Sequence, residues 1–148
     1  MSDSKVNVEI HPATQQYFEA CEEDFPGLID ALIQDFRIYI ASDREVLPLT
    51  FGCDVPYIHP HAAYEAGLMH IHICLPPHTF PEKVPQADRK CRFEEPERDA
   101  ALVYVQGELF ENEYRILAVL YPDAHTKGRD GKTIPYLARV AREFRDAN

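Results

Sequence analysis

The sequence predicts a single α+β domain over residues 1–148, in which an antiparallel β-sheet is combined with two N-terminal helices and a C-terminal helix. Two observations support this prediction. The chain has 148 residues, of which 45% are hydrophobic, enough for one core. Its apolar residues alternate in some segments and recur every three or four residues in others. Because antiparallel sheets often leave one face open, we expect helices on one face and a substrate on the other.

The N-terminal third is predicted to form one strand and two helices. Apolar and polar residues alternate in "KVNVEI" (5–10), which predicts a short strand. Pro12 suits the first position of a helix that reaches about Glu22. The segment "FPGLIDALIQDFRIYIASD" (25–43) has apolar residues at three- and four-residue spacing, which predicts an amphipathic helix. Prolines and a glycine predict a loop over residues 46–66.

Three further strands and a helix complete the predicted order. The strands are "LMHIHICL" (68–75), "AALVYVQG" (100–107) and "YRILAVLY" (114–121). The short turn between the last two indicates an antiparallel hairpin. A long connection rich in proline and charge (76–99) lies between the first and second of these strands. Connections of that length are usually functional or mobile. The polar loop "PDAHTKGRDGKT" leads to the C-terminal helix "TIPYLARVAREFRDAN" (133–148).

The acidic composition disfavours tight binding of free nucleic acid. The net charge is −10, whereas phosphate backbones bind basic surfaces. The charge is unevenly spread, because residues 1–30 hold one lysine and seven acidic residues, but residues 115–148 hold seven basic and four acidic residues. We therefore expect any anion binding near the C-terminal end.

Composition also disfavours a membrane or secreted protein. No segment is apolar for long enough to span a bilayer, and "MSDSKVNVEI" lacks the apolar core of a signal peptide. The four cysteines form no CxxC motif, so we expect reduced thiols rather than a zinc ribbon or a disulfide framework. These features predict a cytoplasmic protein.

Two histidines in "GLMHIHIC" pose the main functional question. His70 and His72 lie two residues apart in a predicted strand and therefore share one face. They are candidates for a metal site, because catalytic zinc typically takes three protein ligands and a water. A third ligand is available from His59, His61 or His125, but the spacing fixes none of them.

The same histidines also suit RNA cleavage. A ribose 2′-hydroxyl attacks its neighbouring phosphate if the protein removes the hydroxyl proton, stabilises the phosphate charge and protonates the 5′-oxygen. Histidine serves as acid or base near neutrality, and arginine and lysine bind phosphate. The loop after the last strand carries His125, Lys127 and Arg129, which the predicted sheet brings to the same end as His70 and His72.

A thiol enzyme is a further alternative, as are histidines that merely lie on a solvated sheet face. Cys74 has the strand parity of His70 and His72, and a cysteine near a base can act as a nucleophile. No second signature supports this chemistry. The sequence has no glycine-rich phosphate loop, GxSxG motif or HExxH motif.

Five stretches resemble the YafO family of type II toxins, which are ribosome-dependent mRNA interferases paired with a small antitoxin. The stretches are "VLPLTFGCDVPY" (46–57), "HIHI" (70–73), "ALVYVQGELFENEYRILAVLYPDAH" (101–125), "RD" (129–130) and "ARVAREFR" (138–145). They stand in the family's order and cover most of residues 28–148. The first 25 residues are either a divergent N-terminal extension or a first strand and helix.

The resemblance implies a RelE-like fold, with an antiparallel sheet flanked by helices, and cleavage of mRNA in the ribosomal A site. RelE-type toxins carry a lysine-any-lysine pair on the first central strand, where this sequence has His70 and His72. The loop after their last strand often carries an arginine or histidine near the cleaved phosphate, and His125 falls there. RelE has a phosphate-binding arginine on the next strand, but the nearest positions here are Ala100 and Ala101.

The resemblance further implies metal-independent acid–base catalysis. We expect His70 or His72 to orient or deprotonate the 2′-hydroxyl, and His125 to act as general acid or to stabilise the phosphate. The expected RNA-binding residues are Arg89, Lys90, Tyr104, Lys127 and Arg129. Tyr104 either stacks on a base or packs in the core.

The expected partners are a cognate antitoxin, the ribosome and mRNA, with no cofactor, metal, membrane or direct DNA contact. A ribosome that holds the mRNA in a reactive geometry would let weak acid–base groups suffice. Two alternatives stay open: a non-enzymatic relative that inhibits a protein target such as gyrase, and a histidine-based zinc hydrolase. The acidic residues 1–30 are expected to tune ribosome affinity.

Overall fold

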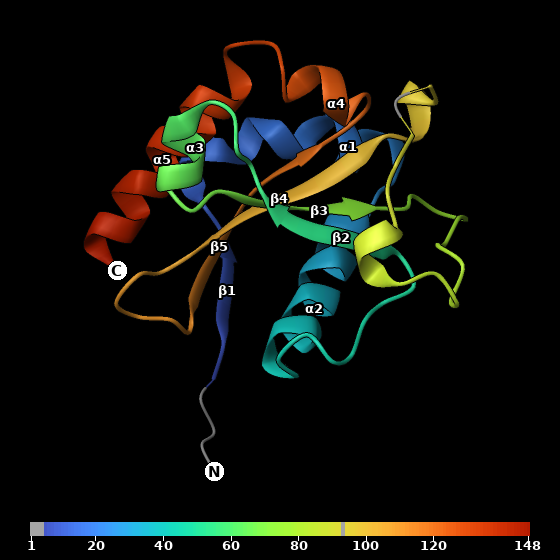
Figure 1. The fold of residues 1–148 in the computed structure, drawn as a ribbon, viewed down its shortest axis with the longest axis horizontal. Coiled ribbons are helices and arrows are strands. Elements are labelled where there is room, and N and C mark those ends of the chain that lie inside the picture. The colour runs from blue at the N-terminus through green and yellow to red at the C-terminus, as the bar shows by residue number, and fades with distance from the viewer. Residues whose placement is uncertain (1–4, 93) are drawn as a thin grey trace.

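The computed structural model describes residues 5–92 and 94–148, and five of its strands form one sheet in the order β1-β5-β4-β3-β2 (Figure 1). The strands are β1 (Asn7–Ile10), β2 (Phe51–Pro56), β3 (Met69–Ile73), β4 (Ala100–Gln106) and β5 (Glu113–Leu120). The helices are α1 (Glu19–Asp24), α2 (Leu28–Ala41), α3 (His61–Glu65), α4 (Ala124–Lys127) and α5 (Thr133–Ala147). Short 3₁₀ helices span Pro12–Phe18, Gln86–Asp88 and Pro96–Arg98. Within the described ranges, no helix has the length and apolar character needed to cross a membrane.

The α+β class is confirmed, but the sheet is mixed rather than wholly antiparallel. β1 pairs with β5 in parallel, with Val8 opposite Tyr114, whereas the other neighbouring strands are antiparallel. The chain then passes through α1 and α2 before it adds β2 at the opposite edge of the sheet. The N-terminal segment is therefore part of the sheet.

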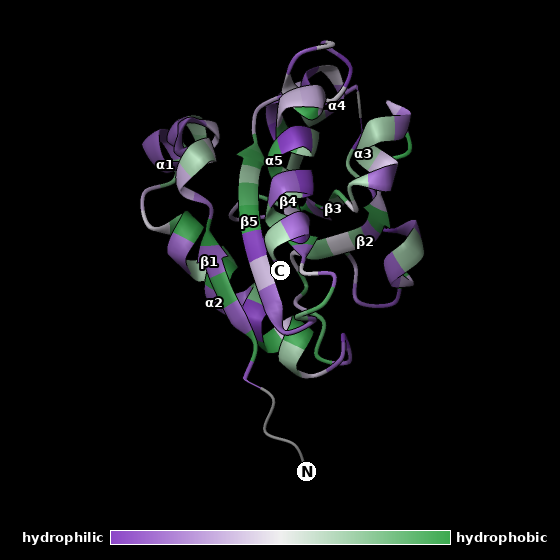
Figure 2. Ribbon diagram, turned by 90° about the vertical axis from the view of Figure 1, so that its left-hand side faces the viewer, coloured by the Kyte–Doolittle hydropathy of each residue, from purple (hydrophilic) through white to green (hydrophobic). Residues whose placement is uncertain are grey.

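Helices cover both faces of the sheet, so the prediction that one face stays open is wrong. α2 packs on one face and α5 on the other, and each face has its own hydrophobic core (Figure 1). In β4, Leu102 and Tyr104 face the α2 core, while Val103 and Val105 face the α5 core. Such a continuous apolar run is typical of a strand that is covered on both faces. In Figure 2, β5 is hydrophilic at its start and hydrophobic along the rest of its length.

The predicted loop over residues 46–66 contains β2 and α3. β2 is an edge strand, where proline is tolerated because the outer N–H groups have no ladder partner, and it carries a bulge between Phe51 and Asp54. The connection after β3 packs against this edge, because the Cys53 N–H donates to the Arg89 carbonyl at 2.8 Å. Gly52 permits this approach, since a Cβ there would collide with the same carbonyl. The connection is thereby held beside His72.

Candidate active site

β3 places His70 and His72 on the same face, as its strand parity predicts. Ile71 and Ile73 fill the α2 core, so the two imidazoles lie on the α5 side of the sheet. Their ring centroids are 5.6 Å apart. Opposite His72 in the ladder is Ala101, whose small side chain leaves space above the sheet.

A cavity of about 220 Å³ opens at this end of the sheet. Its walls include His70, His72 and His125, and Arg129 and His59 lie at its margin among the lining residues. Three alanines line the cavity: Ala100, Ala101 and Ala124. Two of them stand where the resemblance implied a phosphate-binding arginine, so these positions supply room rather than charge.

His125 forms the tightest polar contact of the cavity, with Asp99. The Asp99 carboxylate accepts from the His125 backbone N–H at 2.7 Å and lies 2.6 Å from Nδ1 of its ring. The Asp99 side chain is 1% exposed, whereas that of His125 is 29% exposed. Because an ionised carboxylate only accepts, Nδ1 carries the proton of this contact, and in a neutral ring Nε2 then presents its lone pair.

The short α4 helix is held in place for this contact. Its first residue, Ala124, donates its N–H to the Asp99 carbonyl at 3.2 Å, and the preceding Asp123 donates to the Pro96 carbonyl at 2.8 Å. Two segments that are distant in sequence are thereby joined at the cavity wall. The carboxylate, its main chain and the imidazole form one hydrogen-bonded unit.

His72 has the opposite tautomer. Its Nδ1 accepts the Cys91 N–H at 2.9 Å, so a neutral ring carries its proton on Nε2. Its ring centroid lies 5.8 Å from that of His125, with the rings at 71°. The cavity therefore presents a hydrogen-bond donor on His72 and an acceptor on His125.

Burial keeps His70 and His72 uncharged. Burial is the main cause and the neighbouring histidines a smaller one, and together they lower the pKa of each imidazole to about 4. The His70 ring stacks on Tyr57 with centroids 3.9 Å apart and an angle of 14° between the rings. Burial also raises the pKa of the Tyr57 phenol, so this side chain stays protonated. His70 and Tyr57 thus form a neutral wall.

The predicted RNA-binding residues are only partly brought together. Arg129 is exposed at the cavity margin, and Lys90 is exposed beside His72 in an adjoining hollow. Lys127 is partly buried, and its ammonium group donates to the Pro122 carbonyl. Arg129 and Lys90 therefore share a hollow with one or more of the histidines, whereas Lys127 lines neither hollow.

Arg89 and Tyr104, two of the predicted RNA contacts, are both buried. Arg89 is 5% exposed, and its guanidinium donates to the carbonyls of Val84, Phe51 and Glu82. Tyr104 is 1% exposed and lies in the α2 core, on the face of β4 opposite the histidines. Of its two predicted roles, the structure supports packing. Strand parity alone did not choose between the two roles, because it relates residues within one strand, and His72 and Tyr104 lie on different strands.

Neither the zinc nor the thiol alternative gains support from the geometry. In residues 5–92 and 94–148, no group of three or more His, Cys, Asp or Glu side chains is arranged to hold a metal ion. His61 is instead paired with Glu65 on the surface of α3. Cys74 lines a different hollow, and burial raises the pKa of its thiol to about 11, which disfavours the nucleophilic thiolate.

Sequence reasoning missed Asp99 and Tyr57. Asp99 ends a connection with many charged residues, so nothing local distinguished it from its neighbours. Its one signal was its place directly before the buried strand β4, where an acidic side chain needs a partner. Tyr57 follows a strand that was itself predicted as loop.

Comparison with known proteins places the chain in a family. The sequence model of the family described as "Toxin YafO, type II toxin-antitoxin system" matches residues 37–146. The chain is 31% identical over 121 residues to the mRNA interferase toxin YafO of Escherichia coli (strain K12), covering 79% of this chain and 85% of that protein. No solved structure matches it. The predicted resemblance is confirmed: the chain belongs to the YafO family of toxins of type II toxin-antitoxin systems.

Proposed function

We propose that this toxin is a ribosome-dependent endoribonuclease that cleaves mRNA by metal-independent acid–base catalysis. The observation that supports it most is the His125–Asp99 pair at the cavity wall, with the oppositely polarised His72 beside it. The relative in Escherichia coli carries the name mRNA interferase toxin, which agrees with this chemistry.

In the proposed reaction, His125 is the general base. Its Nε2 takes the proton of the ribose 2′-hydroxyl as the 2′-oxygen bonds to the adjacent phosphorus. The buried Asp99 carboxylate keeps the ring in the required tautomer and stabilises the imidazolium that forms. This assignment exchanges the expected roles, because the resemblance had suggested His125 as the general acid.

His72 and Arg129 serve the phosphate in this proposal. The Nε2–H of His72 donates a hydrogen bond to a phosphate oxygen, where negative charge increases in the transition state. Arg129, at the cavity margin, supplies a positive charge. A neutral imidazole is a weak acid, so the departing 5′-oxygen takes its proton from water, and the His125 imidazolium returns its proton to the hydroxide that remains. The products are a 2′,3′-cyclic phosphate and a 5′-hydroxyl.

The ribosome supplies what this chain lacks. The net charge of −10 disfavours affinity for free RNA. A pair of histidines accelerates cleavage most when the substrate is already bent for in-line attack. We propose that the ribosome binds and orients the mRNA and that the toxin adds the base and the phosphate contacts. As a member of a toxin-antitoxin family, the chain has an antitoxin as its partner.

Primer extension on a defined mRNA tests the proposal. Purified toxin is expected to cut the mRNA only with programmed ribosomes. His125→Ala should lose the cuts, whereas His61→Ala should not, because that side chain is 78% exposed outside the cavity. A substrate with a 2′-deoxynucleotide before the cut should resist cleavage.

Each outcome points to one interpretation. Cuts that persist at the deoxy position would refute attack by the 2′-hydroxyl. Cuts that persist in folded His125→Ala would refute the site. If folded wild-type protein leaves every mRNA intact, the proposed function is wrong, and inhibition of a protein target becomes the hypothesis to test.

A further inference from the structure

A second hollow adjoins the candidate active site and shares two of its residues. Its volume is about 690 Å³, and both His72 and His125 line it as well as the first cavity. Arg44 and Lys90 lie on its other walls. An RNA strand whose cleaved phosphate sits at the two histidines has to continue on one side or the other, and this hollow lies directly beside them.

The main chain places Arg44 in an unusual conformation. It follows α2, and its φ of +67°, like the +57° of Asp43, lies in the left-handed region that non-glycine residues rarely adopt. Its N–H donates to the Tyr39 carbonyl at 2.8 Å, which closes the end of the helix. Residues held in this region tend to occur where a side chain must take one position.

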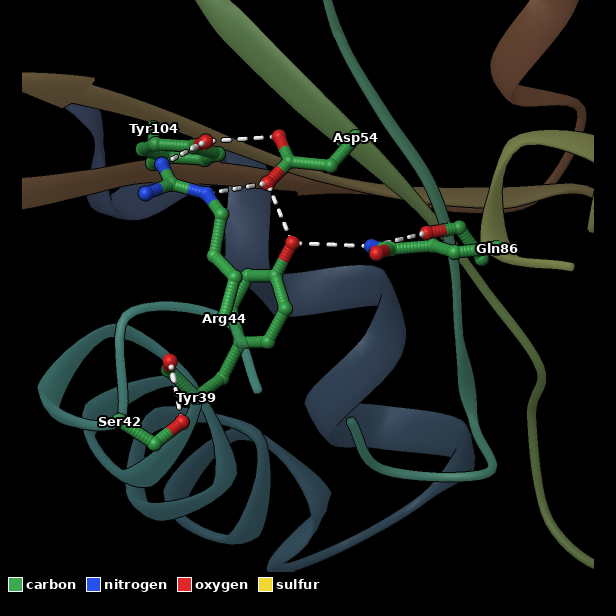
Figure 3. Close-up of polar contacts among 7 residues, drawn as sticks. Tyr39, Ser42, Arg44, Asp54, Gln86 and Tyr104 are labelled. Atoms are coloured by element: carbon green, nitrogen blue, oxygen red, sulfur yellow. Dashed lines mark hydrogen bonds and ion pairs between the residues drawn. The ribbon is translucent and has the colours of Figure 1, made fainter. Parts of the chain in front are cut away.

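The Arg44 side chain is also held by its neighbours. Its Nε donates to Asp54 at 3.3 Å, and Nη2 donates to the Tyr104 hydroxyl at 3.3 Å, as Figure 3 shows. The guanidinium lies 5.7 Å from the centre of the Tyr39 ring. Even so, 39% of the side chain is exposed. The group is oriented from one side and open to a ligand on the other.

The hollow has a surplus of positive charge. Its one carboxylate, Asp54, is 6% exposed and accepts hydrogen bonds from Arg44 and two tyrosine hydroxyls. Lys90 is exposed, directly before Cys91, whose N–H fixes the His72 tautomer. A ligand in this hollow therefore meets two cations and a carboxylate whose oxygens are already bound.

We propose that this hollow is a subsite for an RNA backbone phosphate next to the cleaved one, bound by Arg44 and Lys90. The proposal rests on the proposed function. It gives this chain cationic phosphate contacts that Ala100 and Ala101 do not provide, and it draws them from the end of α2 and from the connection after β3. Arginine binds phosphate through paired N–H groups, and lysine adds a point charge.

Variants at both positions test the subsite with the ribosome-dependent cleavage assay. Arg44→Met and Lys90→Met should each lower kcat/KM about tenfold, the loss of one charged phosphate contact. Arg44→Lys should recover part of the loss, since it keeps the charge. Arg142→Met is the matched control, because this exposed arginine lies on α5 and pairs only with Asp146 among the ion pairs of the described residues.

A modified substrate separates phosphate binding from folding. Two mRNAs are compared. Each carries one uncharged methylphosphonate, in the first mRNA at the phosphate before the cut and in the second at the phosphate after it. At one of these positions the wild-type protein should lose about tenfold in kcat/KM, whereas Lys90→Met should lose nothing more, because the two changes remove the same contact. Lys90 is exposed, so this variant is expected to melt at the wild-type temperature.

The outcomes distinguish the two proposals. If wild-type protein cuts mRNA but Arg44→Met and Lys90→Met cut equally well, the subsite is refuted and the proposed function stands. If the loss of kcat/KM in Lys90→Met multiplies with the loss caused by the methylphosphonate at both positions, Lys90 binds neither phosphate and the subsite is refuted. If the wild-type protein cuts no mRNA, the proposed function itself has failed.

Discussion

Two buried carboxylates, Asp54 and Asp99, have different hydrogen-bond partners. Asp54 is 6% exposed and accepts from the hydroxyls of Tyr39 and Tyr104, each at 2.7 Å, and from Arg44. Asp99 is 1% exposed and is paired with His125. The tyrosines and the arginine keep their protons throughout the physiological range, since burial raises the pKa of both phenols. Of these partner types, only histidine is a side chain suited to proton exchange near neutrality.

The comparison indicates that burial alone does not mark a catalytic carboxylate. Both side chains are desolvated and both are hydrogen-bonded, as buried charges must be. A carboxylate that accepts hydrogen bonds from phenols and a guanidinium, as Asp54 does, stabilises the fold. Under the proposed function, a carboxylate that orients an imidazole at a cavity wall controls the position of a proton. The following substitutions exchange or remove these properties one at a time.

The largest effect is expected for Asp99→Asn. The amide can donate to Nδ1, which would turn the His125 ring tautomer so that Nε2 carries the proton and no longer accepts one. The single-turnover rate of mRNA cleavage should fall about a thousandfold, within the range of general base catalysis. Asp146→Asn, at a carboxylate that is 70% exposed on α5, is the control and should keep the rate. An Asp99→Asn protein with the wild-type rate would contradict the assigned base.

Asp54→Asn should produce the second-largest effect, on stability. An amide accepts through one oxygen only, so the donors from Tyr39, Tyr104 and Arg44 lose partners, and a buried unsatisfied donor costs about 1–3 kcal/mol. We expect the free energy of unfolding in urea to fall by about 2 kcal/mol. A loss of cleavage rate without a loss of stability would reverse the comparison of the two carboxylates.

Much of this arrangement could be predicted from local sequence patterns. The alternation in "MHIHI" indicated that His70 and His72 share a face, and the periodic segments yielded α2 and α5. Each of these signals lies within one element. The same applies to the runs "AALVYV" and "ILAVL", whose lack of polar alternation indicates burial on both faces, although the open-face prediction did not use it.

The rest depends on contacts between distant segments, which no local pattern carries. Asp99 and His125 are separated by 26 positions, and neither the connection nor the four-residue α4 has a periodic signal. β2 is a strand because β3 and the Arg89 main chain pair with it, although its own sequence contains glycine and proline. The parallel position of β1 likewise depends on where β5 lies.

Acid should destabilise the protein through its uncharged histidines. The pKa of His70 is lowered to about 4 in the folded chain, whereas an unfolded histidine titrates near 6.5, so the unfolded state binds more protons between these values. Stability is therefore complete above about pH 6.5 and is lost as the pH falls toward 4. Between pH 6 and pH 5, the free energy of unfolding, measured in urea, should fall by about 1 kcal/mol more for the wild type than for His70→Phe, which keeps a ring stacked on Tyr57.

An exposed histidine provides the control for this pH effect. His78→Phe removes an exposed imidazole and should follow the wild-type pH dependence. Equal acid sensitivity of the wild type and His70→Phe would show that His70 is protonated in the folded state, and the neutral wall beside the cavity would then be wrong.

Tyr104→Phe should have a smaller effect, confined to stability. The ring stays in the core against Phe36, while the hydroxyl that donates to Asp54 is lost. We expect about 1 kcal/mol less unfolding free energy, with an unchanged cleavage rate. Tyr64→Phe, at a side chain that is 54% exposed, should leave both quantities unchanged. A reduced rate in Tyr104→Phe that is also seen when Arg44 is replaced by Met would support the predicted contact of Tyr104 with RNA, because Arg44, which donates to the same hydroxyl, is then absent.

The smallest effect is expected at the acidic N-terminal segment. The exposed carboxylates of Glu9, Glu19 and Glu23 lie outside the range that matches the family, and under the proposed function they would repel ribosomal RNA. Changing these three to glutamine should tighten ribosome binding about two- to threefold at low salt, and the gain should disappear near 0.5 M salt, where the Debye length is only a few ångströms. The single-turnover rate should stay constant, because none of these side chains lines the cavity. A gain that persists at high salt would indicate a specific contact, and no gain at low salt would refute a tuning role for this segment.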